Sequence, residues 1–170
     1  MNLVSYFTFR HRLPVYAAAS TLFSVAVALL AHSFNTGTVL PLAFIVLVLS
    51  YIMRATDDLH DYAKDRRSHK KQLISRDQLI ALCIFLTLVF VILNCCLYGI
   101  MGVISLLLLG IILIWEIFPV CKILFLPLTC IAYVLLTGGT QSLTQYALWL
   151  GSIALLFASC SYYAFKKGNK

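Results

Sequence analysis

Six apolar runs constrain the fold of this sequence more than any other feature. A membrane-spanning helix needs ~20 mostly apolar residues, and the hydrocarbon core offers no partner for unpaired backbone groups. We therefore predict an all-α fold, a polytopic transmembrane helical bundle. It forms one transmembrane domain over residues 1–170, with spans at about 13–32, 39–54, 77–96, 99–118, 123–136 and 143–165.

The composition supports a membrane protein. Hydrophobic residues make up 62% of the chain and charged residues 11%, whereas soluble domains contain about 45–50% apolar and about 25% charged residues. The first twelve residues form a short amphipathic lead that lacks the features of a cleavable signal peptide. The six cysteines lie within or at the ends of the apolar runs and form no CxxC motif, so we interpret them as buried apolar residues.

The basic residues predict the orientation of the spans. Lys and Arg gather near the N-terminus, in segment 54–76, at Lys122 and in the C-terminal tail, which are alternate ends of the six spans. Because short cytoplasmic loops are rich in Lys and Arg, we expect both termini and segment 54–76 on the cytoplasmic side of a bacterial-type inner membrane. Contact with the anionic lipid bilayer explains the net charge of +7, and no nucleic-acid partner is implied.

Acidic side chains are concentrated at the end of the second apolar run. Four of the six acidic residues of the chain lie there, and they are Asp57, Asp58, Asp61 and Asp65. If the helix continues beyond the run, the four aspartates and Arg54 fall within about 100° of one another around its axis. One sector of one helix would then carry four carboxylates and a guanidinium.

Carboxylates crowded on one helix face need a positive partner. Like charges four residues apart destabilise a helix by about 0.2–0.5 kcal/mol per pair, and the penalty grows near a membrane core. Mg²⁺ binds one or two carboxylates together with phosphate oxygens and water, so the segment predicts a Mg²⁺–diphosphate site at the membrane surface. Composition alone is equally compatible with a solvated charged turn between two spans. The one-sided spacing and the scarcity of acids elsewhere favour the site.

Segment 57–65 reads Asp-Asp-x-x-Asp-x-x-x-Asp. It resembles the first aspartate-rich motif of the UbiA superfamily of intramembrane prenyltransferases, which also lies at the cytoplasmic end of the second span. Residues 71–76, Lys-Gln-Leu-Ile-Ser-Arg, look like a degraded form of the family's R-P-L-x-S-G-R stretch before the third span. By this resemblance Asp58, Asp61 and Asp65 match the motif's metal-binding carboxylates. Asp57 matches its Asn-or-Asp position.

The resemblance implies Mg²⁺-dependent transfer of an isoprenyl group from an isoprenyl diphosphate donor to a small aromatic or other acceptor. The four aspartates would be metal ligands, with Asp58 and Asp61 catalytic. The basic residues that are candidates for contacting phosphate oxygens are Arg54, Lys64, Arg66 and Lys71. For the last three, a surface charge that sets the topology is the simpler interpretation, and Arg54 is equally suited to neutralising the acidic face.

The sequence departs from the family in its number of spans and in its aspartate-rich motifs. Family enzymes have more spans and a second aspartate-rich motif, but Glu116 is the one acidic residue after Asp77. Three alternatives follow: a second copy or another membrane subunit completes the site, the protein is a non-catalytic membrane subunit or scaffold derived from this fold, or the sequence is a truncated family member. A CDP-alcohol phosphotransferase is disfavoured because its motif needs a glycine after the first aspartate, and residues 38–98 contain none.

Overall fold

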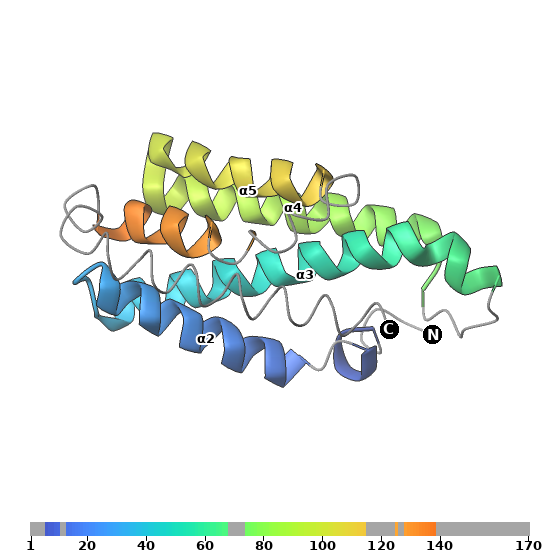
Figure 1. The fold of residues 1–170 in the computed structure, drawn as a ribbon, viewed down its shortest axis with the longest axis horizontal. Coiled ribbons are helices and arrows are strands. Elements are labelled where there is room, and N and C mark those ends of the chain that lie inside the picture. Colours follow the sequence, from blue (N-terminus) through green and yellow to red (C-terminus); the bar gives the residue numbers. More distant parts are fainter. Residues whose placement is uncertain (1–5, 11–12, 68–73, 115–124, 126–127, 139–170) are drawn as a thin grey trace. The chain divides into compact units, whose positions relative to one another are not determined.

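Helices form all the regular structure in the residues that the computed structural model describes, which are 6–10, 13–67, 74–114, 125 and 128–138. The elements in chain order, shown in Figure 1, are η1 (Tyr6–Arg10), α2 (Leu13–Leu30), α3 (Thr36–Arg67), α4 (Arg76–Tyr98), η2 (Gly99–Gly102) and α5 (Val103–Ile114). A further apolar helix covers Leu128–Gly138. The predicted all-α fold is confirmed for these residues, in which no strand occurs.

Among the described residues, three helices are long and apolar enough to cross a membrane, namely α2, the Thr36–Tyr62 part of α3, and α4. Large apolar side chains are exposed along α2 and α4, with Leu22 of α2 at 72% and Phe85 of α4 at 62% exposure. Such surfaces are unfavourable in water and suit contact with lipid tails. These helices indicate a membrane protein.

The later predicted spans are described only in part. The span predicted at about 99–118 includes η2 and α5, and the one at about 123–136 includes most of Leu128–Gly138. The span predicted at about 143–165 lies outside the described residues. A bundle of six spans therefore stays a prediction.

The chain divides into two compact units. Unit 1 contains Met1–Ser24 and Leu40–Leu93, and thus η1, the first part of α2, most of α3 and most of α4. Unit 2 contains Val25–Val39 and Asn94–Lys170, and thus the α2–α3 turn, η2, α5 and the helix Leu128–Gly138.

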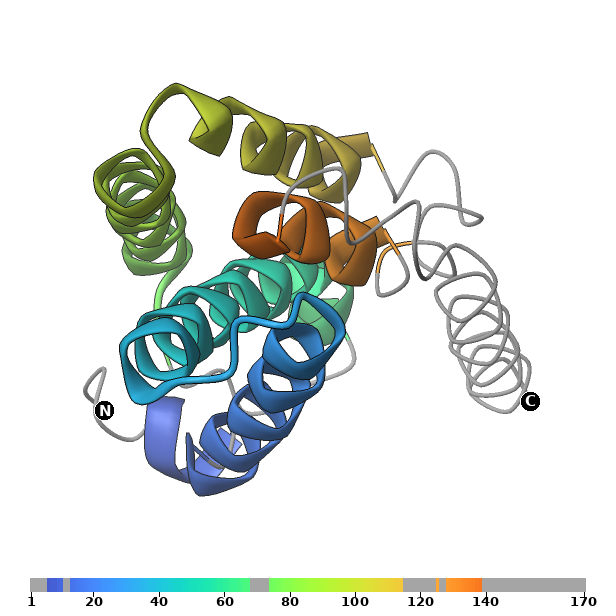
Figure 2. The same ribbon diagram turned by 90° about the vertical axis from the view of Figure 1, so that its left-hand side faces the viewer.

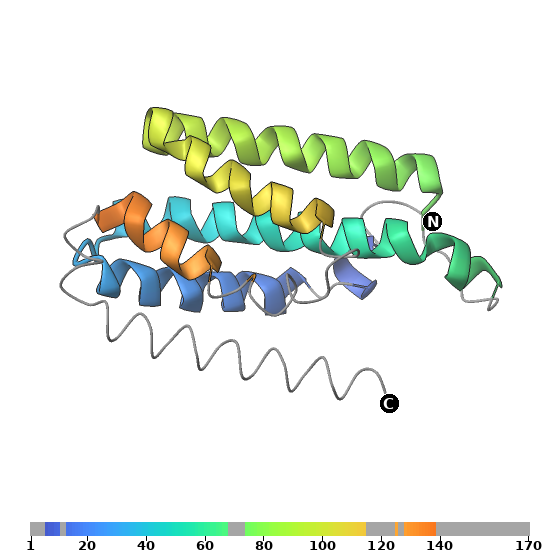
Figure 3. The ribbon, with the colours of Figure 1, turned by 45° about the horizontal axis from the view of Figure 1, so that its top comes forward.

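In unit 1, α3 and α4 each bury one face. The buried residues of α3 follow the three- and four-residue spacing of a helix face and include Leu42, Ile45, Leu49, Ile52 and Ala55. Those of α4 follow the same spacing and are Leu79, Leu82, Leu86 and Phe90. The first part of α2 runs antiparallel beside α3, as Figures 2 and 3 show. The start of α2 therefore lies beside the part of α3 that contains Arg54, and α3 continues beyond it to Arg67.

Helix α3 continues without a break from its apolar part into the acidic segment. It begins after Asn35, whose side-chain Oδ1 accepts a 2.8 Å hydrogen bond from the backbone N–H of Thr38 and caps the helix. Pro41 lies inside the helix, in its second turn, and lacks the N–H that would donate to the carbonyl of Gly37, but the helix continues to Arg67. The continuation on which the predicted one-sided acidic face depends is therefore present.

Helix α4 begins with a reciprocal capping arrangement. The backbone N–H of Ser75 donates to Oε1 of Gln78 at 3.0 Å, and the backbone N–H of Gln78 donates to Oγ of Ser75 at 3.2 Å. Two N–H groups at the helix start are thereby satisfied, and Asp77 places a negative charge in the first turn, where the helix dipole favours it. This cap fixes the start of α4 at Arg76.

Candidate functional site

The acidic face lies on α3 beyond the apolar part of the helix. Asp57 and Asp58 are half-buried and Asp61 is exposed. Residues three and four apart are neighbours on a helix surface, so Asp61 adjoins both other aspartates. Asp65 belongs to the same helix, but its side chain is outside the described part of the structure.

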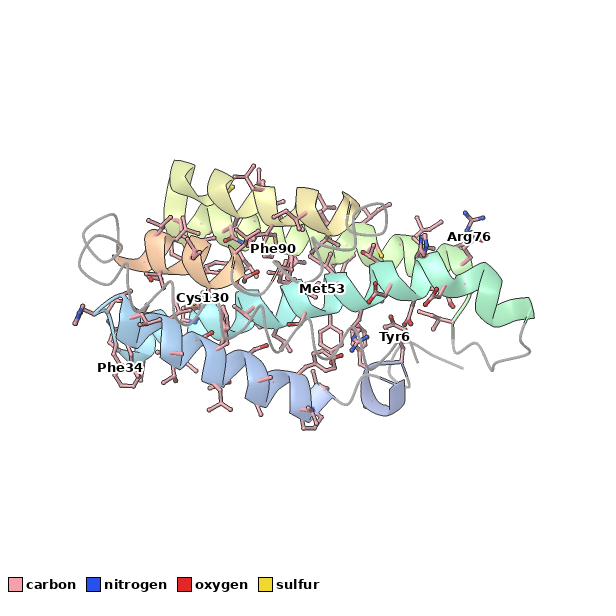
Figure 4. The ribbon with its side chains drawn as sticks, viewed as in Figure 1. Tyr6, Phe34, Met53, Arg76, Phe90 and Cys130 are labelled. Atoms are coloured by element: carbon pink, nitrogen blue, oxygen red, sulfur yellow. The ribbon has the colours of Figure 1, made fainter. Side chains whose placement is uncertain are left out.

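The N-terminal element η1 contacts this face through Tyr6. The Tyr6 hydroxyl donates a 2.8 Å hydrogen bond to Oδ2 of Asp58, which lies 52 residues later in the sequence. Tyr6 is only 1% exposed, and Figure 4 shows it between η1 and α3. A half-buried carboxylate of the acidic face is thus bound by a buried phenol.

Arg54, one turn before Asp58 on α3, is also bound by a tyrosine. Its Nε donates a 2.6 Å hydrogen bond to the hydroxyl oxygen of Tyr16, from the start of α2. The Tyr16 ring lies against the Tyr51 ring, with centroids 5.5 Å apart, and Phe7 of η1 contacts Tyr51 edge-on at 4.8 Å. Three elements therefore meet in an aromatic cluster next to the charged face.

Helix α4 approaches the same region through Cys83. Its side chain shares a hydrogen bond with Thr56 and lies close enough to Asp58 to interact with it electrostatically. The Thr56 hydroxyl also donates a 2.8 Å hydrogen bond to the carbonyl oxygen of Ile52, one turn earlier on α3. Asp58 is therefore hydrogen-bonded to η1 through Tyr6 and interacts electrostatically with Cys83 of α4.

The fit to a metal ion depends on how many protein ligands the ion needs. Among the described side chains, no group of three or more His, Cys, Asp or Glu residues is arranged to hold a metal ion. Mg²⁺ in phosphate-binding sites, however, takes only one or two carboxylates and completes its shell with phosphate oxygens and water. Asp58 and Asp61 meet this smaller requirement by residue type and by their neighbouring positions on α3.

The predicted basic residues are described unevenly. Arg54 is exposed and donates a hydrogen bond to Tyr16. Lys64 and Arg66 belong to the last turns of α3, with side chains outside the described part, and Lys71 falls in a stretch that the structure leaves undescribed. Arg76, which was not predicted, is exposed at the start of α4 and points away from α3 (Figure 4).

The sequence alone did not identify Tyr6, Tyr16 or Cys83 as parts of the site. A usable signal existed, because the positive-inside rule puts the N-terminal lead, the start of the first span and segment 54–76 at the same membrane surface. Comparisons with protein-family models, with curated proteins and with solved structures found no match. The chemistry of the site therefore follows from its own residues: carboxylates, one guanidinium and two phenols at one end of unit 1.

Proposed function

We propose that this protein is a UbiA-like membrane prenyltransferase, which transfers an isoprenyl group from an isoprenyl diphosphate to a small aromatic or other acceptor with the help of Mg²⁺. One observation carries the proposal. Arg54 and Asp58, one turn apart on a helix that continues from an apolar span, are each bound by a tyrosine from another element. Opposite charges held side by side at the end of an apolar helix suit a ligand that combines a charged head with an apolar tail.

The isoprenyl diphosphate matches this arrangement part by part. Its diphosphate needs positive charge and hydrogen-bond donors, which the guanidinium of Arg54 supplies with a geometry suited to phosphate oxygens. Asp58 and Asp61 would hold Mg²⁺, which when bound neutralises charge on the diphosphate and so favours its departure. The isoprenyl tail would extend along the apolar part of α3.

The alternative is a non-catalytic membrane subunit or scaffold of the same fold. In such a protein the contacts of Tyr6 and Tyr16 would only hold η1 and α2 against α3. The two functions differ in one measurable property, because only the transferase needs Mg²⁺-dependent affinity for an isoprenyl diphosphate. A second copy or another membrane subunit would then supply the remaining carboxylates for turnover, so binding is the appropriate first measurement.

The test measures binding of geranylgeranyl diphosphate to the full-length protein in lipid nanodiscs, with Mg²⁺ and with a chelator. We expect binding that requires Mg²⁺ and that Asp61→Ala weakens about 10-fold or more, because the variant removes one of the few ligands. Asp77→Ala is the matched control, since it removes an exposed carboxylate at the start of α4. Binding that ignores the chelator, or that Asp61→Ala leaves unchanged, would contradict the proposed function.

A further inference from the structure

We infer that Tyr6 is a positioning residue, which fixes the carboxylate of Asp58 for cation binding. The inference rests on the proposed function, because it assigns a task within the same site. It extends that function to η1, which contains none of the predicted ligands but would support cation binding through Tyr6.

The first step of the argument is the burial of Tyr6. A buried phenol hydroxyl needs a hydrogen-bond partner, and Tyr6 at 1% exposure finds it in Oδ2 of Asp58 at 2.8 Å. A hydrogen bond from a neutral donor to a carboxylate is about twice as strong as one between neutral groups. The pair therefore holds one oxygen of Asp58 in a defined place.

The second step is that the Tyr6 ring is itself held. Its ring meets Phe7 at a centroid distance of 5.5 Å in an edge-on contact, and Phe7 in turn meets Tyr51 at 4.8 Å. Tyr51 lies seven residues, or about two turns, before Asp58 on the same helix. Element η1 thus contacts α3 at two points, and the phenol cannot follow a rotation of the Asp58 side chain freely.

The third step concerns what a fixed carboxylate does for a cation. With Oδ2 bound to the phenol, the carboxylate has lost most of its rotational freedom before the cation arrives. Binding of the cation through Oδ1 therefore costs less side-chain conformational entropy. Groups that hydrogen-bond to metal ligands in this way typically contribute about 10–100-fold to metal affinity.

Tyr6→Phe tests the inference because it removes the hydroxyl and keeps the ring. Geranylgeranyl diphosphate binding to the full-length protein in nanodiscs is titrated with Mg²⁺. We expect the half-saturating Mg²⁺ concentration to rise about 10-fold, with the diphosphate affinity at saturating Mg²⁺ nearly unchanged. Tyr98→Phe makes the same atomic change in unit 2 and should leave the titration as in the wild type.

The outcomes separate a positioning role from a structural one. If Tyr6→Phe only loosens the fold, diphosphate binding will weaken at every Mg²⁺ concentration and the unfolding midpoint will fall, which overturns the inference. An unchanged or lower half-saturating Mg²⁺ concentration in Tyr6→Phe overturns it as well. If Tyr6→Phe does not fold, Phe7→Leu decides, because weaker seating of η1 should raise the Mg²⁺ requirement in the same direction. A wild type without Mg²⁺-dependent binding overturns the proposed function as well. If Asp61→Ala weakens diphosphate binding but Tyr6→Phe leaves the half-saturating Mg²⁺ concentration unchanged, only the role of Tyr6 is contradicted.

Discussion

At the scale of single residues, Arg54 offers a direct test of phosphate recognition. Arg54→Lys keeps the positive charge but removes the Nε donor and the planar fork, so the bond to Tyr16 and the two-pronged approach to phosphate oxygens are both lost. A hydrogen bond to a charged group contributes about 1.5–3 kcal/mol, so we expect diphosphate affinity at saturating Mg²⁺ to fall about 10-fold or more. Equilibrium binding in nanodiscs measures it.

The control for this change is Arg76→Lys, which alters an exposed arginine that points away from α3. It should leave the affinity at the wild-type value. If Arg54 instead only neutralises the acidic face, Arg54→Lys will bind the diphosphate as tightly as the wild type. That result would remove Arg54 from the set of phosphate-contacting residues.

The same residues show what sequence reasoning reaches. Asp57, Asp58, Asp61 and Arg54 were predicted to share one face because a single helical period decides it. The tyrosine contacts join positions 52 and 38 residues apart, and they depend on how η1 and α2 pack against α3. No local pattern specifies that packing, which is why the aspartates were foreseen and their partners were not.

At the scale of elements, the tight connection between α4 and α5 depends on glycine. A Cβ at Gly102 would lie 2.7 Å from the backbone oxygen of Asn94, closer than real contacts allow, whereas a Cβ at Gly110 would meet nothing within 4 Å. We expect Gly102→Ala to destabilise the protein by about 1–3 kcal/mol, as overpacking does. Gly110→Ala, in the exposed part of α5, should be neutral or stabilising by up to about 1 kcal/mol.

The two variants form a matched pair, and the midpoints of their unfolding transitions in detergent compare them. Equal midpoints would mean that the connection between α4 and α5 relaxes to accept a methyl group. The sequence left the roles of both glycines open, because spacing alone does not tell which one faces another backbone. It also placed a span boundary at about residue 99, where the positive φ of 56° at Gly99 ends α4 and the short helix η2 follows.

At the scale of the whole molecule, composition predicts a membrane-embedded helical protein. Which residues form the candidate site depends instead on contacts between individual side chains. Apolar runs of sufficient length leave few alternatives to spanning helices, and α2, α3 and α4 have that length. Half of the spanning part of α3 is buried, compared with 28% for α4 and 22% for α2. Hydropathy does not distinguish a more buried helix from a lipid-facing one. The sequence therefore assigned the site to α3 from its charged residues.

The orientation of these helices is a prediction that reporter fusions can test. Segment 64–76, from the last turn of α3 to the start of α4, carries six Lys and Arg residues, whereas the turn between α2 and α3 carries none. The positive-inside rule then predicts that the acidic end of α3 lies in the cytoplasm, where a charged diphosphate would reach the proposed site without crossing the bilayer. We expect alkaline phosphatase fused after Phe34 to be active and the same enzyme fused after Arg67 to be inactive, with a green fluorescent protein fusion giving the opposite pattern. The reverse result would place the acidic face on the far side of the membrane, and a donor from the cytoplasm would not reach Asp58 and Asp61.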